Sequence, residues 1–119
     1  MKTVLFVCAH GAYRSRLAAA FFNAAALGGW RAASAGQEPQ ESMSDAAVGL
    51  AAGTAAEPYL ELDRPRAIAD FASPDRVVSI DCDVSGAERW TLATQRVSPE
   101  QRDEIRALAE RFAALLGGS

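Results

Sequence analysis

The chain opens with an uninterrupted apolar run over residues 3–7. A short run of this kind, with β-branched members, is typical of a strand that is covered on both faces. After an irregular stretch over residues 8–14, apolar residues recur every three or four positions from Ser15, which predicts a helix. Gly28-Gly29 is expected to end this helix. Its apolar face comprises Leu17, Phe21, Ala24 and Leu27.

The same alternation of apolar runs and periodic stretches continues to the end of the chain. Ser98-Pro99 predicts the start of a last helix, because serine is a good N-cap and proline fits the first helical position. Gly117-Gly118 is expected to close it. The apolar face of this helix comprises Ile105, Leu108, Phe112 and Leu115. Further strands are expected at residues 30–33, 76–80 and 88–92, and further helical segments at residues 43–52 and 65–71.

This alternation predicts an α/β fold with a parallel sheet and helices on both faces. We expect one domain over residues 1–119, because the length is close to the common domain size and no linker or repeat interrupts the pattern. A chain of 119 residues can bury enough apolar surface to fold without a metal or a disulfide.

Composition narrows the classes of function. Half of the residues are apolar and 23% are charged, which fits a globular protein. The net charge of −3 gives no support for a nucleic-acid partner, because nucleic-acid-binding surfaces are usually basic. No apolar run approaches the roughly 18 residues of a membrane span, so no membrane partner is expected. The N-terminal apolar run is too short for a signal peptide, and we therefore expect a cytoplasmic protein.

Metal-ligating residues are scarce. The chain has two cysteines, Cys8 and Cys82, and one histidine, His10. Structural zinc sites use four such ligands, so no metal site is predicted, and no cofactor is expected. In a reducing compartment the two thiols are either buried small apolar residues or reactive groups.

The strongest chemical signal lies between the first strand and the first helix, where Cys8 is followed five residues later by Arg14 and Ser15. Amides at a helix N-terminus have no partner within the helix, so they can bind an oxyanion. Arg14 can hold two oxygens of the same anion, and the positive field favours the thiolate form of Cys8, which is the nucleophile. The alternative is that Cys8 is a buried strand end and Arg14 a solvated helix start, but the flanking strand and helix favour anion binding.

Each residue of this loop suits such a site. Gly11 can adopt a positive φ and lets the backbone approach the ligand. Ser15 can donate a hydrogen bond to the thiolate. His10 is expected to stiffen the loop through a hydrogen bond or to influence the charge state of Cys8, and Tyr13 is expected to shape the rim. The predicted anion-binding residues are Ala9, His10, Gly11, Ala12, Tyr13 and Arg14.

The segment from Val4 to Ser15 resembles the phosphate-binding loop of the low-molecular-weight protein tyrosine phosphatase family, which includes arsenate reductases of the same fold. Residues 34–39 resemble the second-strand signature of that family and are nearer to its arsenate reductase branch. Weaker similarity at residues 75–80, 88–90 and 102–105 extends the resemblance over nearly the whole chain.

The resemblance implies a fold of the phosphotyrosine phosphatase I-like type, with a four-stranded parallel sheet flanked by helices. It implies Cys8 as the nucleophile, Arg14 as the anion clamp and Ser15 as the stabiliser of the thiolate. The amides from Ala9 to Arg14 would then surround the oxyanion.

Two departures from the family pattern bear on activity. The family usually has asparagine at the position of Gly11, so this loop lacks that side chain's hydrogen bonds. The family also carries an Asp-Pro pair after the fourth strand, whose aspartate is the general acid; residues 91–95 are Thr-Leu-Ala-Thr-Gln, and the chain contains no Asp-Pro pair. General-acid help contributes about 100- to 10,000-fold to rate. Asp81 and Asp83 are candidates for a substitute acid; the alternative is that they only solvate or cap the loop.

Cys82 is a candidate resolving thiol. If the third strand lies beside the first, both cysteines lie at one sheet edge, and Cys82 could attack a Cys8 adduct and leave a Cys8–Cys82 disulfide. Thioredoxin-coupled members of the family use two further cysteines, whereas this chain has one. The other route is transfer to a small thiol such as glutathione or mycothiol. The alternative is that Cys82 is only a buried apolar residue.

Three functions follow from these observations. A thiol-coupled arsenate reductase is favoured by His10, by residues 34–39 and by the tolerance of arsenate chemistry for a missing acid. A phosphatase that hydrolyses phosphotyrosine or another phosphate monoester through a phosphocysteine is favoured by Asp81 and Tyr13. A non-catalytic phosphate-binding or regulatory module is the third. The expected partners are phosphate or arsenate, with thioredoxin, glutathione or mycothiol as the reductant.

Overall fold

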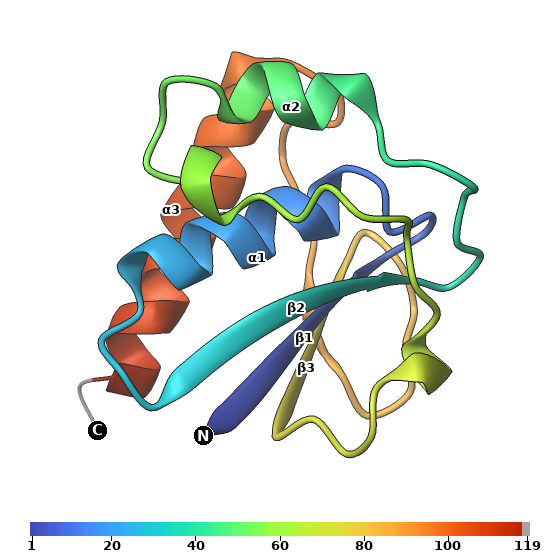
Figure 1. The fold of residues 1–119 in the computed structure, drawn as a ribbon, viewed down its shortest axis with the longest axis vertical. Helices are drawn as coiled ribbons and strands as arrows, with labels where there is room; N and C mark the ends of the chain where they lie inside the picture. The colour runs from blue at the N-terminus through green and yellow to red at the C-terminus, as the bar shows by residue number, and fades with distance from the viewer. Residues whose placement is uncertain (118–119) are drawn as a thin grey trace.

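Four parallel strands form the central sheet of the computed structural model, which describes residues 1–117 (Figure 1). Their order across the sheet is β2-β1-β3-β4, so the apolar β1 is buried between two neighbours. The predicted α/β fold with a four-stranded parallel sheet is confirmed. The strands are β1 (Lys2–Cys8), β2 (Trp30–Gly36), β3 (Arg76–Ile80) and β4 (Glu88–Trp90).

The strand register brings distant segments to one edge of the sheet. Cys8 pairs with Gly36, and Val7 pairs with Ser79. Because the carboxyl ends of parallel strands meet at the same edge, the loop after β1 lies between the segment after β2 and Asp81 after β3. β2 runs three residues past its expected end at Ala33, since Ser34, Ala35 and Gly36 continue the pairing with β1.

Helices cover the sheet mainly on one face. α1 packs against α3 and against β1 and β2 (Figure 1). Within residues 1–117, no helix combines the length and the apolar character that a membrane span requires. The α-helices are α1 (Arg14–Ala25), α2 (Asp45–Ala51) and α3 (Pro99–Gly117), and the short 3-10 helices are η1 (Glu57–Tyr59) and η2 (Ile68–Asp70).

Two residues predicted on apolar helix faces are exposed. α1 ends at Ala25, ahead of the two glycines, so Leu27 lies past the helix and is 76% exposed. Leu115 is 65% exposed, and Leu116, four residues after Phe112, packs against the core in its place. α3 runs through Gly117, and the predicted closure at Gly118 lies outside the described residues.

Alternate residues of β1 point to opposite faces of the sheet. Val4 and Phe6 join the larger core with α1 and α3, where the rings of Phe6 and Trp90 lie 5.4 Å apart. Leu5 and Val7 join a smaller cluster, which side chains of Ile68 and Phe71 cover. Among the described residues, the short η2 is therefore the one helix on this second face, and segments of loop complete the cover.

Candidate active site

The loop after β1 turns all of its carbonyl oxygens toward the surrounding protein. Amides of the segment after β2, the side chain of Arg16 and the first turn of α1 occupy them. The six acceptors are Cys8 O from Gln37 N (3.0 Å), Ala9 O from Glu38 N (2.8 Å), His10 O from Gln40 N (3.2 Å), Gly11 O from Arg16 Nε (2.9 Å), Ala12 O from Ser44 N (3.0 Å) and Tyr13 O from Leu17 N (3.0 Å).

The amides of the same peptides point the other way. In a trans peptide the carbonyl of one residue and the amide of the next are directed oppositely. The outward carbonyls of residues 8–13 therefore turn the amides of residues 9–14 inward. None of these six amides donates a hydrogen bond to another group among residues 1–117. A ring of unpartnered amides at a helix N-terminus is a binding site for an oxyanion.

Two glycines let this loop approach β2. Gly11 has φ of +66°, and a Cβ atom there would lie 2.7 Å from the amide nitrogen of Gly36. A Cβ atom at Gly36 would lie 2.4 Å from the carbonyl carbon of His10. The positive φ predicted for Gly11 is confirmed, whereas the requirement for glycine at position 36 was not predicted, because it depends on a contact between segments far apart in the sequence.

Cys8 lies at the base of the loop and is buried. Its Sγ lies 3.1 Å from Oγ of Ser15, which is fully buried at the start of α1. The neutral thiol donates this hydrogen bond; once the thiol ionises, the hydroxyl can donate to the thiolate instead. Ser15 is thus placed where it can stabilise the nucleophilic form of Cys8.

Arg14 is held in place by residues beyond β3 and β4. Its Nε lies 3.7 Å from Oδ2 of Asp81, and its Nη2 donates to the carbonyl oxygen of Gln95 (3.4 Å). The Asp81 carboxylate also accepts from the Leu92 amide (3.0 Å) and from Nε2 of Gln95 (3.2 Å). This geometry makes Asp81 a positioning partner of the guanidinium, with its oxygens already engaged as acceptors.

The side chains of the other two candidates form no hydrogen bond or ion pair with the loop. The Asp83 side chain is 94% exposed and pairs with Arg89, so none of its side-chain contacts reaches the Cys8 loop. Cys82 is buried in the smaller cluster, and its thiol donates to the carbonyl oxygen of Val7 (3.5 Å). Burial raises the pKa of Cys82, and the negative charge of a Cys8 thiolate raises it further.

A cavity of about 220 Å³ opens over the loop. Its walls carry no carboxylate side chain. Within residues 1–117 there is no group of three or more His, Cys, Asp or Glu that could hold a metal ion. The cavity is lined by Cys8, Ala9, His10, Ala12, Tyr13, Arg14, Gln40, Ser44 and Val97.

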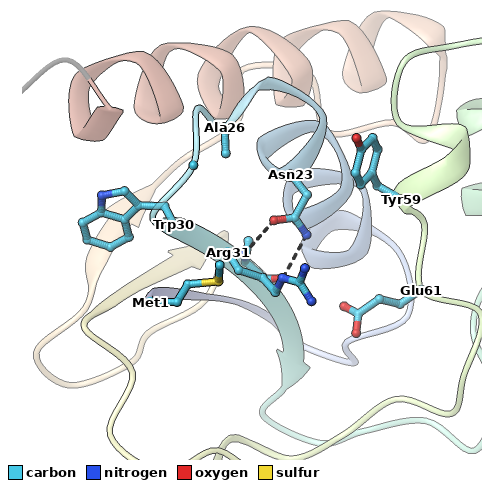
Figure 2. A pocket seen from close by; sticks show the side chains of 9 residues that line it. Met1, Asn23, Ala26, Trp30, Arg31, Tyr59 and Glu61 are labelled. Atoms are coloured by element: carbon cyan, nitrogen blue, oxygen red, sulfur yellow. Dashed lines mark hydrogen bonds between the residues drawn. The ribbon is translucent and has the colours of Figure 1, made fainter.

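A larger cavity, of about 420 Å³, lies at the opposite end of the sheet and contains none of the predicted site residues (Figure 2). Trp30, Arg31, Tyr59 and Glu61 are among its lining residues. Asn23 also lines it, but both polar atoms of the Asn23 amide are bound to the backbone of Ala32 in the edge strand β2 (2.8 and 3.0 Å). This cavity has no nucleophile, so we assign the chemistry to the smaller one.

Arg16 supports the site and was not predicted. It is 3% exposed, and its guanidinium joins the Gly11 carbonyl to the Glu61 carbonyl (2.5 Å) and to the Asp63 carboxylate (3.6 Å). The signal in the sequence was an arginine directly ahead of the apolar run over residues 17–22 of α1.

Comparison with known proteins gives no match to a family model and no match to a curated protein. Solved structures do match over nearly the whole chain. An arsenate reductase from Archaeoglobus fulgidus has 29% sequence identity and a TM-score of 0.71, with 98% of this chain and 99% of that chain covered.

Two other solved structures agree. An arsenate reductase in its phosphate-binding state has 20% identity and a TM-score of 0.76, with 97% and 98% of the two chains covered. A low-molecular-weight protein tyrosine phosphatase from T. tengcongensis has 21% identity and a TM-score of 0.70, with 94% and 97% covered. The resemblance drawn from the sequence is confirmed by the fold, and the comparisons support a cysteine-dependent oxyanion enzyme of this superfamily.

Proposed function

We propose that this protein is a thiol-coupled arsenate reductase in which Cys8 is the nucleophile. The observation that carries the proposal is the ring of six inward amides above Cys8, closed by Arg14. Such a ring neutralises the charge of a tetrahedral oxyanion while the sulfur lies directly beneath it.

The reaction needs two thiols. The Cys8 thiolate forms an S–As bond with arsenate, and an As–O bond breaks to release water. A second thiol then forms an S–S bond with Cys8, and the electron pair of the S–As bond reduces arsenic from As(V) to As(III). The products are arsenite and a disulfide, so the two thiols supply the two electrons.

The composition of the cavity wall favours arsenate over a phosphate ester. The segment over residues 91–98 reaches the site through Gln95 and Val97 but contains no acidic residue. Phosphate esters with poor leaving groups need a general acid, which contributes about 100- to 10,000-fold. Arsenate exchanges its oxygens and thiol adducts readily, so it tolerates this absence better. The similarity to the Archaeoglobus fulgidus enzyme agrees with this choice.

The second thiol is either Cys82 or an external thiol: thioredoxin, glutathione or mycothiol. Cys82 follows β3, next to β1, and is close enough for the charge of Cys8 to affect its pKa. The raised pKa of Cys82 keeps it in the less reactive thiol form, which favours an external reductant. Chemistry that consumes thiols needs a reducing compartment, and we therefore place the protein in the cytoplasm.

The test measures thiol consumption that depends on arsenate, with dithiothreitol, glutathione or thioredoxin supplied in turn. Cys8→Ser should abolish the reaction, and Cys82→Ser should abolish it only if Cys82 resolves the adduct. Turnover that persists in Cys8→Ser, or a wild-type protein that consumes no thiol with any reductant, would refute the proposal.

A phosphatase is the second candidate, because the same ring of amides fits phosphate and Tyr13 lines the cavity. Hydrolysis of p-nitrophenyl phosphate by the wild type, lost in Cys8→Ser, with no arsenate-dependent thiol consumption, would favour it. Phosphate binding without either reaction would instead identify a non-catalytic binding module.

A further inference from the structure

His10 lines the cavity that holds Cys8. Its ring Nδ1 lies 3.3 Å from the carbonyl oxygen of Glu38, in the segment after β2. A carbonyl oxygen can only accept a hydrogen bond, so Nδ1 is the nitrogen that carries a hydrogen in this contact. The second ring nitrogen, Nε2, has no hydrogen-bond partner among residues 1–117 and is free to bind a ligand.

The backbone of His10 is anchored to the same segment. Its carbonyl oxygen accepts from the Gln40 amide (3.2 Å), and Gly36 approaches its carbonyl carbon too closely for any side chain. Ring and backbone are therefore both held by residues 36–40. A proton donor needs such a fixed position, because proton transfer depends on hydrogen-bond geometry with the reacting atom.

The other acids near Cys8 are less suitable than His10 as proton donors. Asp81 is engaged with Arg14, and the exposed Asp83 is paired with Arg89. The Tyr13 hydroxyl has no exposed surface, and burial raises the pKa of Tyr13 although the charges of Arg14 and Arg102 oppose this. A phenol enclosed in this way cannot reach a departing oxygen.

We propose that His10 is the general acid of this site, donating a proton from Nε2 of its imidazolium to the oxygen that leaves when Cys8 attacks. The S–As bond forms, the As–O electron pair departs with the oxygen, and the Nε2 proton completes the leaving water. Neutral His10 then regains a proton from solvent. This inference rests on the proposed function and names the residue that replaces the aspartate missing from residues 91–98.

The surroundings of His10 determine how its protonation affects the reaction. Its own loop contributes the charged or titratable groups of Cys8, Tyr13 and Arg14. The facing segment contributes the neutral Gln40 and Ser44 to the cavity wall, and its acidic residue Glu38 meets the ring through the backbone carbonyl. Val97 adds no charge. A protonated ring would add a second positive group beside Arg14 for the bound anion.

The first experiment compares the wild type with His10→Gln, which keeps a hydrogen-bonding side chain but cannot transfer a proton. Arsenate-dependent thiol consumption should fall by about 100-fold, the lower end of the range for general acids, because arsenate loses an oxygen more readily than a phosphate ester does. Protection of Cys8 from iodoacetamide by inorganic phosphate should change by no more than about threefold. Glu41→Gln removes a charge from the same segment at an exposed position and should leave turnover unchanged. Turnover of His10→Gln within about threefold of the wild type would overturn the inference.

The pH profile separates proton donation from a structural role. Wild-type turnover should decline as pH rises, because the step takes a proton from the enzyme, and His10→Gln should lack this decline. The pH dependence of Cys8 alkylation should be the same in both proteins. A decline that persists in His10→Gln, or an alkylation profile that shifts while the decline remains, contradicts the role of proton donor.

Aryl phosphates distinguish failure of this inference from failure of the proposed function. If the wild type hydrolyses them but consumes no thiol with arsenate, arsenate reduction is wrong. The role of His10 is then tested by comparing two substrates whose leaving groups differ. His10→Gln should then lose more activity with phenyl phosphate than with p-nitrophenyl phosphate. An equal loss with both substrates, or no turnover of any substrate by the wild type, would refute the general acid.

Discussion

Gly11 shows how a single residue controls the shape of the anion site. We expect Gly11→Ala to lower the free energy of unfolding by more than the about 1–3 kcal/mol that a strained φ imposes alone. Its Cβ would meet the Gly36 amide at 2.7 Å, so the loop must also move away from β2. Phosphate affinity should fall with it. Urea denaturation and phosphate titration measure the two effects.

Gly53 provides the matched control for this substitution. It has φ of +75°, and a Cβ there would meet nothing within 4 Å. Gly53→Ala should therefore show only the cost of the strained φ and bind phosphate like the wild type. Equal destabilisation by the two substitutions would mean that the contact between Gly11 and Gly36 contributes nothing.

The residues that form the loop could be predicted from sequence, but their supports could not. Cys8, Arg14 and Ser15 are close in sequence, and the strand and helix on either side fix their relative positions. Arg16 and Gln95 act through contacts with distant segments, which no local pattern reveals. Asp81 was identified, but its role as a partner of Arg14 depends on where the segment after β4 folds back.

Side chains from neighbouring elements hold the segment between β4 and α3 in place. Three side chains from outside the segment bind its backbone: Asp81 holds the Leu92 amide, Glu104 holds the amides of Ala93 (2.6 Å) and Thr94 (2.8 Å), and the buried Gln101 donates to the Thr94 carbonyl (2.8 Å). This anchored segment in turn offers the Gln95 carbonyl to Arg14. At the place where the phosphatase family that the sequence resembles carries its general acid, this chain has a segment that holds Arg14 in position.

The stability of this segment should depend on pH through Glu104. Burial acts to raise the pKa of Glu104, but hydrogen bonds from the Ala93 and Thr94 amides outweigh it and lower the pKa. The folded state therefore favours the carboxylate. This contribution is present above the ordinary pKa of glutamate, about 4.3, and is lost as pH falls through the lower pKa of the folded state.

Urea denaturation at neutral and acid pH tests this contribution. Glu104→Gln should lower the free energy of unfolding by about 1 kcal/mol at neutral pH, because one charge-assisted pair of hydrogen bonds is weakened at a partly exposed site. The difference from the wild type should shrink as pH falls below about 4. A difference that is constant with pH would show that the charge of Glu104 has no part in it.

The elements themselves were largely predictable, and the errors lie at their ends. Periodicity located the strands and α-helices because the apolar face of each one is buried against the sheet or a helix. Leu27 and Leu115 were misplaced because capping and the rotation of 3.6 residues per turn decide which terminal leucine reaches the core. η1 was missed, since Gly53 ahead of it and Pro58 within it are typical of turns and loops.

At the scale of the whole molecule, the anion site joins segments from all four strands. The loop, the segments after β2 and β3, and the segment between β4 and α3 each contribute a contact to it. A bound oxyanion would satisfy six amides that otherwise face one another without partners. Its binding should therefore stabilise the entire fold and not only the loop.

Phosphate should raise the melting temperature, and the rise should grow with the logarithm of phosphate concentration once that concentration exceeds Kd. At a concentration of 100 times Kd, a ligand that binds only the folded state adds about 2.7 kcal/mol, which corresponds to about 10 °C for a chain of this size. Cys8→Ser should keep this shift, because the amides and Arg14 remain, whereas Arg14→Leu should lose most of it. Arg31→Leu, in the larger cavity, should behave as the wild type. If Arg31→Leu removes the shift and Arg14→Leu does not, phosphate binds at the opposite end of the sheet, and the six amides are not its site.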